Sequence, residues 1–107
     1  MVSNQYAVIL VNLDPTVGSE VKKTRPCVVI SPDEMNRQVN TLIIAPITST
    51  SKAYPSRIQV QSGGRTGWVM IDQVRTIDRL RIVKVLGRLS GDEIDKIKQV
   101  IKELLVD

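Results

Sequence analysis

The chain has 107 residues, of which 42% are hydrophobic and 24% charged, and this is the composition of a single folded globular domain. It has no histidine, which excludes Ser-His-Asp and Cys-His nucleophile systems and His-ligated metals, and no apolar stretch reaches the roughly 18–20 residues of a membrane span. The formal net charge of +4 favours a phosphate-rich or acidic partner, and the N-terminus lacks a signal peptide's basic flank and cleavage site, so we expect a cytoplasmic protein.

Three apolar runs rich in β-branched residues predict strands over 6–13, 25–30 and 41–47. The single cysteine, Cys27, lies inside the second run, so we expect a buried core residue and not a reactive thiol. Proline has no N–H to give to a sheet, so Pro46 near the end of the third run predicts an edge strand or a bulge.

The second half of the chain continues with shorter strand patterns. Residues 57–61 alternate between polar and apolar, and 67–71 follow a glycine-rich turn, so these two segments are expected to pair as a hairpin. Strand-like segments over 74–77 and 80–86 bring the total to six or seven short strands. This number predicts a small β-barrel.

A helix over 91–105 follows the strands. Ser90 and Glu93 match a capping box, Leu89 and Ile94 match a hydrophobic staple, and apolar residues recur every three or four positions as far as Leu105. This apolar face is expected to pack on the barrel. Residues 1–90 carry 12 Lys and Arg against 6 Asp and Glu, whereas 91–107 carry 3 against 5, so the barrel is the basic part.

Two polar segments are candidates for chemistry. In the first, Ser19 and Glu20 precede Arg25 across a basic turn, and in the second the strand exit at Thr48 leads through further hydroxyls to Lys52. Each segment alone is typical of an ordinary turn or loop.

In this order along the chain, the two segments belong to a longer pattern that resembles the MazF/PemK/Kid family of toxin endoribonucleases, also called mRNA interferases. The resemblance covers nearly the whole chain. Its five blocks are residues 11–20 (VNLDPTVGSE), 25–32 (RPCVVISP), 45–49 (APITS), 72–78 (DQVRTID) and 87–90 (GRLS).

The resemblance implies one MazF-like domain over 1–107, mainly β with a C-terminal helix. Its SH3-like barrel of six or seven strands would span about 5–89, its helix about 91–105, and two copies would form a homodimer whose groove binds single-stranded RNA. It also implies sequence-specific cleavage of mRNA without metal or other cofactor. In that reaction the 2′-OH attacks the adjacent phosphate and leaves a 2′,3′-cyclic phosphate and a 5′-OH.

The resemblance assigns the catalytic roles to Arg25 and Thr48, with assistance from Glu20. Arg25 would stabilise the transition-state charge through bidentate contact with the phosphate, and Thr48 would donate a hydrogen bond to the same oxygens. In a chain without histidine Glu20 is the best general base. An arginine has a pKa above about 12, so electrostatic stabilisation is favoured over proton transfer for Arg25.

RNA binding is expected around these residues, and Trp68 or Tyr54 would be available to stack a base, although a Trp in an apolar run is more often part of the core. The loop sequence Val-Lys-Lys-Thr at 21–24 differs from the family's usual Gln and Gly, which bears on loop closure and on the RNA motif that is cleaved. The expected substrate-binding residues are Ser19, Ser49, Ser51, Lys52 and Gln73.

The expected partners are single-stranded RNA and an acidic, flexible, MazE-like antitoxin, with no membrane and with no DNA as substrate. Two alternatives share the barrel. A CcdB-like toxin binds gyrase and cleaves nothing, but its action depends on a C-terminal Trp that this chain lacks. A non-catalytic RNA-binding barrel is the other alternative, because the presence of apparent catalytic residues does not prove turnover.

Overall fold

The computed structural model describes residues 4–13, 24–50, 54–62 and 64–106. None of the helices in these ranges is long and apolar enough to cross a membrane. The described elements, in chain order, are β1 (Ala7–Asn12), β2 (Thr24–Val29), α1 (Asp33–Gln38), β3 (Thr41–Thr48), β4 (Arg57–Ser62), β5 (Arg65–Met70), the 3-10 turn η1 (Ile71–Gln73), β6 (Arg75–Asp78), the 3-10 turn η2 (Arg79–Arg81), β7 (Ile82–Arg88), α2 (Gly91–Ile101) and a π-helical turn η3 (Lys102–Val106).

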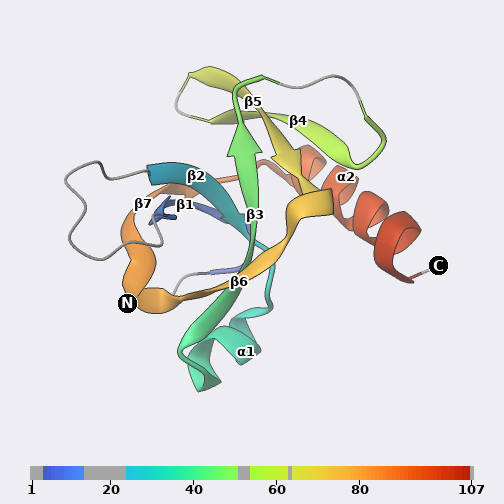
Figure 1. The fold of residues 1–107 in the computed structure, drawn as a ribbon. Helices are drawn as coiled ribbons and strands as arrows, with labels where there is room; N and C mark the ends of the chain where they lie inside the picture. The colour runs from blue at the N-terminus through green and yellow to red at the C-terminus, as the bar shows by residue number, and fades with distance from the viewer. Residues whose placement is uncertain (1–3, 14–23, 51–53, 63, 107) are drawn as a thin grey trace.

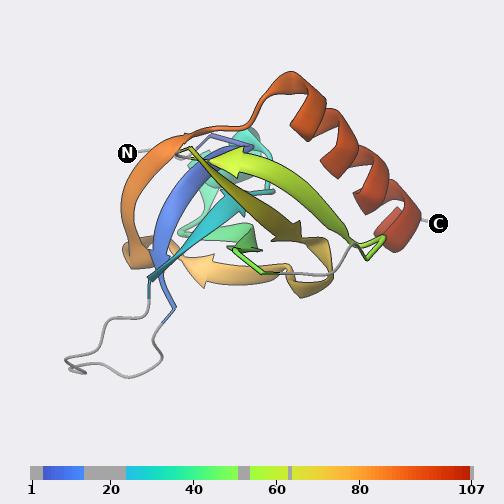
Figure 2. The same ribbon diagram turned by 90° about the horizontal axis from the view of Figure 1, so that it is seen from above.

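The strands form an antiparallel sheet in the order β4-β5-β3-β2-β1-β7, and β6 pairs with the first half of β3. The sheet bends into a half-barrel, with α2 packed beside β4 and α1 at the opposite end of the molecule from the β4–β5 hairpin (Figures 1 and 2). This arrangement confirms the predicted barrel-like domain with a C-terminal helix, and β4 and β5 pair as the predicted hairpin.

Both faces of β1 and of the second half of β2 are buried, which explains why these segments are apolar runs without alternation. Val8 and Val28 face a core that α2 covers with Ile97, whereas Ile9 and Cys27 face a second core on the other side of the sheet. The cysteine is fully buried, as predicted. Two cores with the sheet between them hold β2 and β3 in a fixed register, and the candidate site lies at the end of these two strands.

The predicted capping box of α2 is present. Glu93 accepts a hydrogen bond from the Ser90 N–H at 2.9 Å, and its second oxygen accepts one from the Gln61 N–H of β4 at 2.7 Å. Partial burial raises the pKa of Glu93, but the hydrogen bonds from Ser90 and Gln61 outweigh it, so the pKa lies below the ordinary value. The Glu93 carboxylate thus caps the N-terminus of α2 and links it to the edge strand β4.

The apolar face of the helix is shorter than predicted. Ile97 is buried and Ile94 packs against the same core, but Leu104 and Leu105 are 48% and 58% exposed. The chain changes to π-helical geometry at Lys102, which turns the following side chains out of the α-helical spacing that the sequence pattern assumes.

Helix α1 is absent from the sequence prediction, which left 33–40 without an element. It has six residues and no side-chain hydrogen bond at its N-cap, so its local signal is weak. Tertiary contacts hold it instead: buried Asn36 donates to the Ser31 carbonyl at 3.0 Å, and the Arg79 guanidinium donates to the carbonyls of Asn36 and Val39.

The expectation of an edge strand or a bulge at Pro46 is wrong. β3 lies inside the sheet, and its register with β2 runs without a shift through the pair Cys27 and Pro46. On its other side the partner changes, because the pairing with β6 ends at Ile44 and the pairing with β5 begins at Ile47. Pro46 lies in this gap, where no ladder hydrogen bond is needed on that side.

Candidate active site

Arg25 and Thr48, 23 residues apart in sequence, lie on neighbouring strands at the same end of the sheet. The β2–β3 register includes the pair Cys27 and Pro46, and continuing it for two residues sets Arg25 opposite Thr48. On its other side Thr48 pairs with Trp68 of β5. The sheet therefore brings together two of the three residues predicted to be catalytic, without help from any loop.

A pocket of about 480 Å³ opens at this point. Among the described residues that line it, the charged ones are Arg25 of β2 and Arg65 of β5, and none is a carboxylate. These described residues give the pocket a positive electrostatic field, and its hydroxyls can donate hydrogen bonds. The lining residues are Leu10, Thr24, Arg25, Pro26, Ile47, Thr48, Ser49, Arg65, Thr66, Gly67 and Leu86.

The Thr48 hydroxyl is oriented by a local turn. Its Oγ1 accepts a hydrogen bond from the Thr50 N–H at 3.3 Å and donates one to the Thr50 carbonyl at 3.1 Å. Among the described residues, that carbonyl is the acceptor with which an incoming phosphate oxygen would compete for the hydroxyl proton. Ser49, which follows Thr48, also lines the pocket and is exposed.

Cys27 lies behind the pocket and contributes no nucleophile. Burial raises the pKa of its thiol to about 12, against the opposing effect of the nearby guanidinium groups of Arg25 and Arg75. The thiol donates a hydrogen bond to the Arg25 carbonyl at 3.5 Å. The cysteine thus belongs to the support of β2 and not to the reacting groups.

Other residues predicted for the site are distributed differently. Gln73 is exposed in η1 and does not line the pocket. Trp68 is half-buried on β5, next to Thr48 in the sheet, whereas Tyr54 is 49% exposed and lies beside Arg57. The remaining predicted residues lie outside the described residues, and they are Ser19, Glu20, Ser51 and Lys52.

Of the lining residues, the sequence predicted Arg25, Thr48 and Ser49 for the site. Those it did not predict include Arg65 and Thr66 of β5, and Leu86 of β7. Leu86 forms a β-bulge in β7: Val8 pairs with Gly87 and the next residue, Ile9, pairs with Val85, so the pairing with β1 passes over Leu86. This bulge cannot be recognised from hydropathy. The glycine-rich turn before Arg65 predicted the hairpin, but nothing in the sequence showed that the hairpin would lie beside the end of β3.

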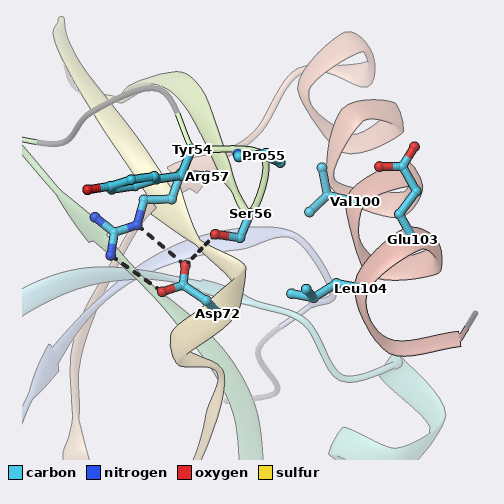
Figure 3. Close-up of a pocket in the computed structure, with 8 residues that line it drawn as sticks. All are labelled: Tyr54, Pro55, Ser56, Arg57, Asp72, Val100, Glu103 and Leu104. Atoms are coloured by element: carbon cyan, nitrogen blue, oxygen red, sulfur yellow. Dashed lines mark hydrogen bonds and ion pairs between the residues drawn. The ribbon is translucent and has the colours of Figure 1, made fainter.

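A second and larger pocket, of about 640 Å³, lies between the start of β4 and the C-terminal helix (Figure 3). Its arginine is paired: an Arg57 guanidinium nitrogen lies 3.4 Å from one carboxylate oxygen of Asp72, and the other Asp72 oxygen accepts a hydrogen bond from Ser56 at 3.1 Å. The Arg57 hydrogen bond holds the pKa of Asp72 below its usual value. Because this arginine already has an acidic partner, we place anion chemistry in the pocket of Arg25.

Comparison with known proteins identifies the family of the chain. The family model described as PemK-like, MazF-like toxin of type II toxin-antitoxin system matches residues 4–105. The chain is 36% identical over 98 residues to the endoribonuclease toxin MazF of Escherichia coli strain K12, covering 91% of this chain and 88% of that protein. It is 31% identical over 108 residues to the endoribonuclease EndoA of Bacillus subtilis strain 168, covering 95% and 93%.

The fold is similar to that of a solved relative as well. In a crystal structure of MazE-MazF from Deinococcus radiodurans, the matching chain gives a TM-score of 0.84 at 26% identity, with 99% of this chain and 98% of that chain covered. A match along nearly the full length, in sequence and in structure, is far more specific than any single motif. The chain therefore belongs to the family of PemK-like, MazF-like toxins of type II toxin-antitoxin systems.

Proposed function

We propose that this protein is a toxin endoribonuclease that cleaves single-stranded RNA at a short sequence motif without a metal ion. The observation that carries the proposal is the placement of Arg25 and Thr48 side by side at a pocket whose described lining residues include two arginines and no carboxylate. Close relatives named as endoribonucleases support the same activity.

The proposed reaction is a transesterification within the RNA. The ribose 2′-OH attacks the adjacent phosphorus, its proton passes to a general base, and the P–O bond to the next 5′-oxygen breaks. That oxygen then takes up a proton and leaves as a 5′-OH, while the other product ends in a 2′,3′-cyclic phosphate. Charge builds up on the non-bridging oxygens of the phosphorane, so donors placed there accelerate the step.

Arg25 is the main electrostatic group in this proposal. A guanidinium presents a planar pair of donors that matches two phosphate oxygens, and no described carboxylate forms an ion pair with Arg25. Thr48 adds a hydroxyl donor from the neighbouring strand, after its proton turns from the Thr50 carbonyl to the phosphate. Both groups are fixed by the sheet, which lowers the reorganisation needed in the transition state.

Glu20 is the proposed general base, because the chain has no histidine for that role. RNA contacts are proposed for Ser49 at the pocket, for Gln73 outside it, and for three residues whose placement the structure does not describe. These three are Ser19, Ser51 and Lys52.

The decisive experiment incubates a long single-stranded RNA with wild type, Arg25→Ala, Arg25→Lys and Arg37→Ala in the presence of EDTA, and maps the cut sites and end groups. Arg37 on α1 is the matched control, because its variant loses the same charge far from the pocket. We expect cleavage at one repeated motif with 5′-OH ends, lost in Arg25→Ala and retained in Arg37→Ala. Near-normal cleavage by Arg25→Lys would refute the bidentate role.

The same variants separate the alternatives. RNA binding without cleavage by the wild type would indicate a non-catalytic RNA-binding barrel. If the wild type neither binds nor cleaves RNA, a protein-binding toxin of the CcdB type is indicated. A pull-down experiment with gyrase would test that alternative.

We also propose that the protein is cytoplasmic and that an acidic antitoxin binds it and covers the basic pocket. The net charge of residues 1–90, with 12 Lys and Arg against 6 Asp and Glu, supports such a partner. The structure that matches this chain from Deinococcus radiodurans is one of MazE-MazF.

Expression of the wild type alone should arrest growth, and expression of Arg25→Ala should not. Harmless wild type that cleaves RNA in vitro would refute the toxin role and leave the nuclease.

A homodimer is the proposed assembly, formed through β7. Among the described strands it ends the sheet and has no partner on its outer edge, and Val83, Val85 and Leu86 are 56%, 44% and 44% exposed. An apolar free edge is normally covered in a native protein. Light scattering should give twice the chain mass for wild type and the monomer mass for Val83→Asp. The control Val39→Asp, a similarly exposed valine outside β7, should stay dimeric.

A further inference from the structure

Arg65 is the second cation of the pocket, and neither the sequence pattern nor the proposed catalytic chemistry assigns it a role. It lies at the first position of β5, directly after the hairpin turn, and its side chain is exposed. No described carboxylate forms an ion pair with it. An arginine that faces a pocket without an acidic partner is poised to bind an anion.

The position of Arg65 differs from that of Arg25 in a way that the sheet defines. Thr48 pairs with Trp68, and Arg65 precedes Trp68 by three residues on the same strand. At about 3.3 Å per residue, the backbone of Arg65 is displaced by about 10 Å along β5 from the level of Thr48. This is about three times the rise of about 3.4 Å between stacked nucleotides, so the backbone of Arg65 lies level with a different nucleotide from the one whose phosphate is held at Arg25 and Thr48.

The pocket that holds the two arginines also has an apolar wall suited to a nucleoside. Gly67 has no side chain, Ile47 and Leu86 are apolar, and all three line the pocket. Thr66 also lines the pocket, and its hydroxyl accepts a hydrogen bond from the Gln61 side chain at 2.9 Å, which fixes that oxygen and helps to hold the hairpin end.

We infer that Arg65 binds a backbone phosphate of the RNA other than the scissile one, and so positions the strand across Arg25 and Thr48. This inference rests on the proposed function, since it takes single-stranded RNA as the ligand. Arg65 is a positioning residue in this scheme: it touches the RNA backbone but not the reacting atoms. Its contact is with a phosphate and not with a base edge, so it contributes affinity without sequence preference.

The first test measures binding alone. A single-stranded 2′-O-methyl RNA lacks the attacking hydroxyl and stays intact, so its affinity can be measured by fluorescence anisotropy over a series of salt concentrations whether or not the protein cleaves RNA. Arg65→Ala should weaken binding about tenfold at low salt and reduce the slope of log K against log salt by about 0.7, the value for one phosphate contact on a single strand. Arg37→Ala should change neither quantity, and equal thermal melting of all variants will show that they fold.

The second test identifies the phosphate. Substrates with one neutral methylphosphonate at each position around the cleavage site are compared for wild type, Arg65→Ala and Arg25→Ala. The loss caused by Arg65→Ala should disappear for one modified position only, and that position should not be the scissile phosphate. A loss that persists at every position, or one that disappears at the scissile phosphate, would overturn the inference.

Kinetics provide a readout that a structural role would not give. With unmodified RNA, Arg65→Ala should raise KM and leave kcat within about twofold, whereas Arg25→Ala should lower kcat. If the wild type cleaves RNA and Arg65→Ala matches it in affinity, salt slope and KM, the role of Arg65 is refuted and the proposed nuclease stands. If nothing is cleaved but the binding of 2′-O-methyl RNA depends on Arg65 as expected, the catalytic proposal fails and the phosphate contact stands.

Discussion

Replacing Gly67 by alanine tests whether the close approach of β5 to β3 shapes the pocket. A Cβ at this position would lie 2.5 Å from Cγ2 of Ile47, whereas ordinary contacts are 3.4–4 Å, so one of the two must move by about 1 Å. Ile47 is 5% exposed and packed in the core beneath α2, which leaves little room for that movement. Ile47 also precedes Thr48, so a displaced Ile47 would shift the threonine that we propose to be catalytic.

The expected cost follows from two opposing effects. Overpacking of this kind costs about 1–3 kcal/mol, while replacing glycine by alanine recovers about 0.4–1 kcal/mol by restricting the unfolded chain. The free energy of unfolding should therefore fall by roughly 1–2 kcal/mol, and the melting temperature by at least about 4 °C, since 1 kcal/mol corresponds to roughly 4–8 °C in a domain of this size.

The matched control is Gly91→Ala at the start of α2. A Cβ there meets no atom within 4 Å, so this variant should be as stable as wild type or slightly more stable. Calorimetry compares the two melting temperatures, and RNA cleavage compares the two active sites. If Gly67→Ala melted as high as Gly91→Ala and cleaved RNA as fast, the reasoning about the strand contact would be wrong.

Three further predictions concern stability and reactivity. The pKa of Glu93 is lowered in the folded state, so the stability that this carboxylate contributes is present above the ordinary carboxyl pKa and is lost as the pH falls through the folded pKa. The free energy of denaturant unfolding of Glu93→Gln should therefore depend less on pH between about pH 5 and pH 3 than that of wild type. With a pKa of about 12 and full burial, Cys27 should react with iodoacetamide only after unfolding, and rapid labelling of the native protein would contradict its place in the core. Arg79→Ala should lower the free energy of unfolding by about 1–3 kcal/mol, because the carbonyls at the end of α1 lose their donor; an unchanged urea midpoint would show that α1 is held by other contacts.

Much of the fold followed from local sequence patterns. Buried strands need apolar β-branched runs and helices need caps, and both signals are short-range, so β1, β2 and β3 and the capping box at Ser90 were predicted nearly in place. Helix α1 was missed for the converse reason. Part of its support comes from Arg79, whose guanidinium reaches the carbonyls of Asn36 and Val39 only after η2 has folded against the helix.

The same division applies to the candidate site. A family resemblance pointed to Arg25 and Thr48, but their distance in space depends on the register of β2 with β3. The hydropathy pattern indicates which face of a strand is buried, and it does not say which residues of two strands pair. Arg65 and Leu86 reached the pocket through a hairpin that lies beside the end of β3 and through a bulge in β7. Sequence alone determined which segments become strands and which residue types carry the chemistry, because these depend on neighbours along the chain. Tertiary structure decided which charges share one pocket, because strand pairing brings together residues that are distant in sequence.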